Sequence, residues 1–310
     1  MNDADPGLFG PRSVTWQMHG DPMMWIAGIR ALYLQALHPR AVRGVTQNSD
    51  FRRDAWGRLL RTASFVGTIT YGTTAAAEQA GARVRKIHRT LKATDPATGE
   101  TYGIDEPELL LWVHCAEVDS YLQVQRRSGF PLTDAQADRY VDEHRAGARL
   151  VGLDPAKVPA TAAALAAYFE RVRPELALGP EAADVDDFLR NPPVHPCSAR
   201  RAPRLAARGS TRLPVTAPVR PRVVRQTRPP PATVDRRLRA TGAVLRAIPD
   251  RLRWQLPPGH ILKAMARLGP GSRPPRTGSA GRPPYWTGRG GRSGSSGDDG
   301  AGSGRWRTPG

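Results

Sequence analysis

The stretch that decides the fold class is MMWIAGIRALYLQAL, residues 23–37. Its apolar residues recur at the three- and four-residue spacing of a helix that buries one face, and Pro39 follows shortly after the last of them. The run is shorter than a bilayer span and contains Arg30, which a membrane-spanning helix would carry only at a high energetic cost. The pattern therefore predicts a buried helix of a helical domain.

Outward from this run, the same periodicity continues through the first 190 residues and predicts an all-α fold. Asp50 is expected to cap the helix over residues 51–71, and Thr74 the helix over residues 75–93. Residues 94–105 (TDPATGETYGID) are rich in turn formers and predict a loop. Asp184, Asp186 and Asp187 are expected in a solvated loop. No run of alternating β-branched residues predicts a sheet. The expected helices cover residues 23–37, 51–71, 75–93, 106–127, 133–151 and 159–172.

The net charge of +18 is unevenly distributed along the 310 residues. Acidic and basic side chains are nearly balanced in residues 1–195, which we expect to form the helical domain. Residues 196–233 are rich in Arg and Pro and predict an irregular segment. Residues 234–268 are amphipathic and are expected to form helices that dock on the core. Residues 269–310 have linker composition and predict a basic, largely disordered tail.

The two cysteines, Cys115 and Cys197, exclude a disulfide framework and a C-x-x-C zinc site. The N-terminus is acidic and lacks the basic and apolar regions of a signal peptide. These features predict a cytoplasmic protein, with at most weak contact at a membrane surface.

Three histidines lie in apolar helical segments and are candidates for binding a cofactor: His38, His88 and His114. His88 shares a predicted helix face with Val84, Ile87 and Leu91, so its imidazole is expected to be buried. The alternative for each is a core histidine that is hydrogen-bonded to a backbone carbonyl. The other four are expected at polar or irregular positions and are poor candidates: His19, His144, His195 and His260.

The spacing of His, Cys and carboxylate residues matches neither a zinc nor a di-iron site. An isolated imidazole instead suggests a cofactor that supplies most of its own ligands, such as haem. Arg58 and Thr62 form a second candidate pair, because residues four apart share a helix face. The alternative for this pair is a solvated arginine and a hydroxyl that bonds back to the carbonyl four residues earlier.

Taken together, these segments resemble the family of MpaB-type oxygenases and bacterial latex-clearing rubber oxygenases. The resemblance covers roughly residues 10–193 and rests on the order and spacing of its motifs. The matching stretches are LQALHP (34–39), GV (44–45), SDF (49–51), RLLRT (58–62), VRKIH (84–88), ELLLWVH (108–114) and NPP (191–193).

The resemblance implies an all-α domain that holds one haem b and uses O₂ to oxidise a hydrophobic, often isoprenoid, substrate. It implies that His88 is the axial iron ligand and that Arg58 and Thr62 lie near the haem as catalytic residues. His38 and His114 are then expected to line the pocket or support it. The rubber-cleaving branch has a lysine where this chain has Arg61, and its members carry export signals, so rubber itself is not the expected substrate.

The rival hypothesis is a non-enzymatic binding protein whose basic tail contacts nucleic acid or an anionic membrane. The tail has few aromatic residues between its arginines, so the stacking that single-stranded nucleic acid needs is poorly supported. Arginines alone would give weak, salt-sensitive binding. We therefore expect no specific nucleic-acid partner, and the sequence leaves the oligomeric state open.

Overall fold

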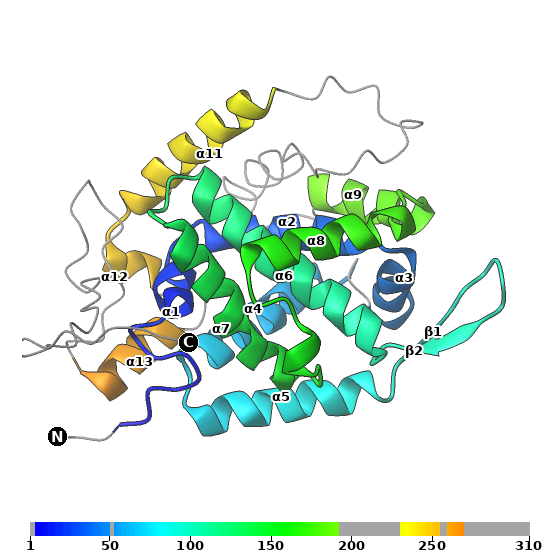
Figure 1. Cartoon of the computed structure of the whole chain (residues 1–310), viewed down its shortest axis with the longest axis horizontal. Coiled ribbons are helices and arrows are strands. Elements are labelled where there is room, and N and C mark those ends of the chain that lie inside the picture. The colour runs from blue at the N-terminus through cyan, green and yellow to red at the C-terminus, as the bar shows by residue number, and fades with distance from the viewer. Residues whose placement is uncertain (1–3, 50–52, 192–229, 255–258, 270–310) are drawn as a thin grey trace, which may run out of the picture. The chain divides into compact units, whose positions relative to one another are not determined.

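The computed structural model describes residues 4–49, 53–191, 230–254 and 259–269. The all-α prediction is confirmed, because helices dominate this part of the chain and the strands in it are two segments of three residues (Figure 1). The helices are α1 (Val14–His19), α2 (Met24–Ala36), α3 (Pro39–Asn48), α4 (Ala55–Tyr71), α5 (Thr74–His88), α6 (Pro107–Arg127), α7 (Asp134–Leu150), α8 (Ala162–Val172), α9 (Pro180–Arg190), α11 (Pro231–Arg246), α12 (Asp250–Arg253) and α13 (His260–Leu268).

Side chains at the N-termini explain where several helices begin. Thr73, Thr133 and Thr161 each accept a hydrogen bond from a backbone N–H in the first turn of the helix that follows. The cap of α5 is thus Thr73 rather than Thr74. Asp54 caps α4, whereas the predicted cap Asp50 lies outside the described residues.

The segment between α5 and α6 differs from the prediction. The helix expected to reach residue 93 ends at His88. β1 (Lys92–Thr94), which begins within that expected helix, pairs antiparallel with β2 (Thr101–Gly103) of the expected loop. Ala93 lies opposite Tyr102, and both are buried together with Leu109. Strands this short show no alternation in the sequence, because their burial depends on a tertiary contact.

The aspartates near residue 185 also differ from the prediction, because they lie in helix α9 and not in a loop. Asp186 accepts hydrogen bonds from Arg190 at 2.9 Å, one helical turn later. α9 also buries Ala182 and Val185 against Ala36 and Val42. Packing on α2 and α3 therefore makes this acidic segment helical.

A buried ion pair joins α2 to α6, the helices in the middle of the fold (Figure 1). Arg30 lies 2.8 Å from Asp119 and donates a 2.7 Å hydrogen bond to the hydroxyl of Ser120. Both partners belong to α6, so Arg30 is satisfied without reaching solvent. α6 packs in turn on α7, and α4 packs on α5.

The helices after residue 230 pack on the first part of the chain, α11 against α6 and α13 against α4. Arg246 of α11 lies 2.7 Å from Asp21, whose side chain is fully buried, and also donates to the carbonyl of Ser128. α11 begins at Pro231, three residues before the predicted amphipathic segment. The rest of the predicted irregular segment, up to residue 229, and nearly all of the predicted tail lie outside the described residues.

In the described part of the chain, none of the helices combines the length and the hydropathy that crossing a bilayer requires.

Candidate functional site

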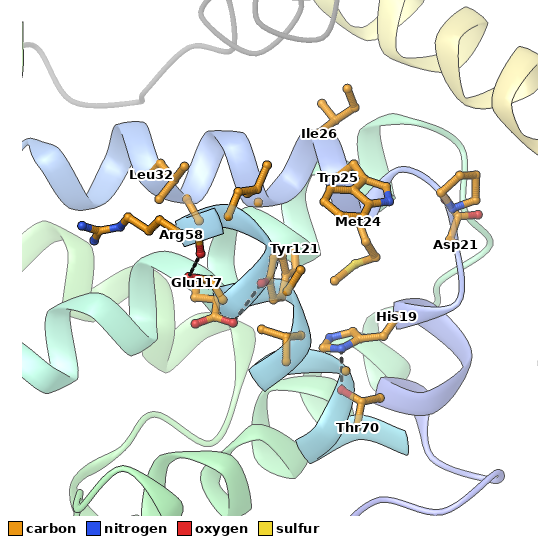
Figure 2. Close-up of a pocket in the computed structure, with 18 of the residues that line it drawn as sticks. His19, Asp21, Met24, Trp25, Ile26, Leu32, Arg58, Thr70, Glu117 and Tyr121 are labelled. Carbon is orange, nitrogen blue, oxygen red and sulfur yellow. Dashed lines mark hydrogen bonds between the residues drawn. The ribbon is translucent and has the colours of Figure 1, made fainter. Parts of the chain in front are cut away.

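A cavity of about 620 Å³ lies between α2, α4, α6 and the helices after residue 230 (Figure 2). This volume is within the range of small-molecule sites in proteins. Most of its lining is apolar. Among the apolar lining residues are Trp25, Leu32, Val66, Val113, Ile248 and Trp254.

α4 contributes both members of the predicted catalytic pair to this cavity. Arg58, Thr62, Val66 and Thr70 follow one another at four-residue spacing, and all four are in the lining. The guanidinium of Arg58 donates to the hydroxyl of Ser49. The hydroxyl of Thr62 donates to the carbonyl of Arg58 at 3.1 Å, which is the helix-internal bond of the alternative interpretation.

His19 lines the cavity with both ring nitrogens engaged. Nδ1 lies 3.0 Å from the hydroxyl of Thr70 (Figure 2). Nε2 lies 3.1 Å from the hydroxyl of Tyr140. Burial lowers the pKa of His19 to about 3, so the imidazole is neutral at pH 7. A histidine in this state is a fixed part of the wall.

A carboxyl group faces the same apolar cavity from α6. The hydroxyl of Tyr121 donates a 2.9 Å hydrogen bond to Oε1 of Glu117, and both residues are in the lining (Figure 2). Burial raises the pKa of Glu117, against the opposing effect of the Tyr121 hydrogen bond. The sequence analysis missed this pair. The available signal was an acid within the apolar part of α6, followed four residues later by a tyrosine.

His88, the predicted axial ligand, is the last residue of α5 and is not among the residues that line the cavity. Its Nδ1 is buried without a hydrogen-bond partner, and burial lowers its pKa although Asp105 acts in the opposite direction. The buried face expected around it is incomplete, because Ile87 is 49% exposed. α5 ends here and the chain turns into β1, which leaves about half of Ile87 exposed.

His38 and His114 also lie outside the cavity lining. His38 is the N-cap of α3, where its Nδ1 accepts the N–H of Ala41 at 3.5 Å, and its Nε2 lies 3.6 Å from Glu175. The ring of His114 lies 6.3 Å from that of His144, and burial lowers its pKa to about 4. The structure thus brings Arg58 and Thr62 together at the cavity and places the three predicted histidines elsewhere.

His19 and His144 were expected at polar or irregular positions, and this expectation is wrong. Both are buried, their ring centroids are 5.3 Å apart, and His144 packs on Tyr140 at 4.4 Å. Every residue of the short helix α1 is buried, and α7 turns His144 inward, although neither segment is strongly apolar in sequence. His260 begins α13 and lines the cavity, and His195 lies outside the described residues.

Of the two histidines that line the cavity, His260 has an unpartnered ring nitrogen and His19 does not. His19 uses both nitrogens, whereas Nε2 of His260 is buried beside Gly67 without a hydrogen-bond partner. His88 is neutral and unpartnered at Nδ1 but lies outside the lining. Among the described residues, the predicted axial ligand and the apolar enclosure therefore lie at different places, and the unpartnered imidazole in the enclosure is that of His260. The described residues contain no group of three or more His, Cys, Asp or Glu that could hold a metal ion.

Comparison with known proteins gives one match. No curated protein and no solved structure matches the chain. The family model described as "ER-bound oxygenase mpaB/B'/Rubber oxygenase, catalytic domain" matches residues 16–247, which include every helix from α2 to α11. Because this match covers more than half of the chain, the protein belongs to the family of ER-bound oxygenase mpaB/B' and rubber oxygenase catalytic domains.

Proposed function

We propose that this protein is a haem-b-dependent oxygenase that uses O₂ to oxidise a hydrophobic substrate held in the cavity between α2, α4 and α6. The observation that carries the proposal is that Arg58 and Thr62, selected as catalytic from the sequence, both line this apolar cavity of about 620 Å³. Membership of an oxygenase family supports the reaction class. An isoprenoid is the substrate class that the resemblance favours.

In this proposal the cavity binds the substrate mainly by burying its apolar surface. Arg58 supplies a fixed positive charge at the wall, because arginine stays protonated even though burial lowers its pKa. Such a charge stabilises negative charge that develops on oxygen during the reaction. Thr62 adds a hydroxyl to the same wall, one helical turn from Arg58. The haem, when bound, would supply the activation of O₂.

The haem part of the proposal rests on the family and on the chemistry of His88. A neutral imidazole without a hydrogen-bond partner is suited to bind iron. His88 meets this condition at Nδ1. The described residues enclose His88 only in part, since the neighbouring Ile87 is 49% exposed.

The decisive experiment is the visible spectrum of the full chain after reconstitution with excess haem, with the Soret absorbance measured per polypeptide. We expect a Soret band in the unmodified protein, its loss in His88→Ala, and its retention in His260→Ala. His260 is the matched control because it lines the cavity and His88 does not. Loss of the Soret band in His260→Ala alone would show that the haem iron binds in the cavity, at His260. No haem uptake by protein shown to be folded by circular dichroism would exclude the haem-dependent reaction.

A second experiment tests the catalytic pair once a substrate is identified. Arg58→Ala is expected to keep its haem content but lose about 10²–10³-fold in turnover, the effect of removing one preorganised donor. Arg61→Ala is the control, because Arg61 is exposed and pairs with Asp54 away from the cavity lining. Equal turnover in Arg58→Ala and the unmodified protein would show that Arg58 has no catalytic role.

A further inference from the structure

The polar pair Glu117–Tyr121 stands out within the apolar cavity. A carboxyl group placed against apolar walls is costly unless its oxygens have partners. Oε1 of Glu117 accepts the Tyr121 hydroxyl at 2.9 Å, whereas no hydrogen bond or ion pair is described for Oε2. Glu117 lines the cavity and is only partly buried, so Oε2 is reachable from the cavity.

We propose that Glu117 is the polar anchor of the cavity and binds the hydroxyl group of an otherwise apolar alcohol. This inference rests on the proposed function in one respect, that the cavity is the substrate site. It adds the substrate class: a hydrophobic molecule with one hydroxyl, which reaches Glu117 while its hydrocarbon part lies along the apolar walls.

The state of the carboxyl group favours a hydroxyl over other head groups. Burial raises the pKa of Glu117, and no cation contributes to the shift, so the carboxyl takes up a proton more readily than an exposed one. A protonated carboxyl both donates and accepts hydrogen bonds. A hydroxyl also does both, and binding it moves no charge into the cavity.

The charges of the other lining residues argue against an ammonium group. Arg58 lines the cavity, Arg253 of the lining is paired with Asp250, and the other acid of the lining, Asp21, is already paired with Arg246 at 2.7 Å. A cationic ligand would therefore face the guanidinium of Arg58 and would favour an ionised Glu117, which burial disfavours. The serious competitor is a carboxylate, which would go to Arg58 instead of Glu117.

The inference can be tested with three ligands that share a ten-carbon chain: 1-decanol, decanoate and decylammonium. Their affinities are measured by isothermal titration calorimetry on the full chain, with the haem it holds after purification. We expect 1-decanol to bind about 3–10-fold more weakly to Glu117→Leu than to the unmodified protein, the effect of one hydrogen bond. Glu117→Gln, which keeps a donor and an acceptor, is expected to bind within about 2-fold of the unmodified protein.

Leu32→Ala is the matched control, because it removes apolar lining and should weaken all three ligands alike. Circular dichroism shows that each variant is folded. The inference is overturned if 1-decanol binds equally to Glu117→Leu, if decylammonium binds best and depends on Glu117, or if decanoate binds best and depends on Arg58. The Soret measurement is separate, so a failure of the alcohol site does not bear on the haem, and the reverse also holds.

Discussion

The histidines of this protein occupy two contrasting environments. His19, His114 and His144 lie close together among aromatic rings, with ring centroids 5.3 Å apart between the first and last. His88 lies alone at the end of α5, next to the exposed Ile87. The sequence favoured His88 over His19 and His144 as a buried cofactor ligand, because apolar periodicity indicates only which residues share a face of one helix. Burial depends on what the other helices bring to that face.

The largest expected effect that separates the two environments is the loss of stability in acid. Burial lowers the pKa of His19 to about 3 and that of His114 to about 4, against about 6.5 in an unfolded chain. Below pH 6.5 the unfolded state therefore binds protons that the folded state does not, so the free energy of unfolding falls as the pH falls towards 4. At pH 5 the loss is about 2 kcal/mol for each of these two histidines.

Urea unfolding at pH 7 and pH 5 measures this loss. His114→Leu should reduce the difference in the free energy of unfolding between pH 7 and pH 5 by about 2 kcal/mol, the contribution of one histidine. His88→Leu should reduce the difference by less, because Asp105 opposes the effect of burial on the pKa of His88. Equal stability of the unmodified protein at both pH values would mean that the three histidines are not buried as a cluster.

A smaller effect is expected from truncating one histidine in each environment at pH 7. His144→Ala should reduce the free energy of unfolding by about 2–3 kcal/mol, because it leaves a hole beside Tyr140. His88→Ala should cost less than about 1 kcal/mol. Thermal unfolding of both variants gives the comparison, and a larger cost for His88→Ala would show that its surroundings are more enclosed than the structure describes.

The smallest expected effect is that of Ile87→Ser. With 49% of Ile87 exposed, the substitution should change the free energy of unfolding by no more than about 0.5 kcal/mol. The same variant can also be used to measure haem retention. If a haem bound to His88 covers this surface, Ile87→Ser should weaken haem retention, whereas Leu60→Ser, at a position 45% exposed on α4, should not.

The helices whose residues carry strong local signals could be predicted well. The apolar run that opens at Met23 forms α2, and Pro107 and Thr133 begin α6 and α7 as expected. The sequence also placed Arg58 and Thr62 on one helix face, because four-residue spacing is a local property. The short helices α1 and α3 were not predicted. β1, β2 and α9 were also missed, since their burial comes from distant partners such as Leu109 and Ala36.

The sequence by itself determined the helical class, most helix boundaries, the family and the shared face of Arg58 and Thr62. Each of these follows from residues close together along the chain or from the order of motifs. The tertiary structure alone decided that the pair faces an apolar cavity, that Glu117 and Tyr121 meet inside it, and that His19 and His144 are buried while Ile87 is exposed. The physical reason is that burial, and with it the pKa of each titratable group, is set by side chains from other helices, which no local pattern records.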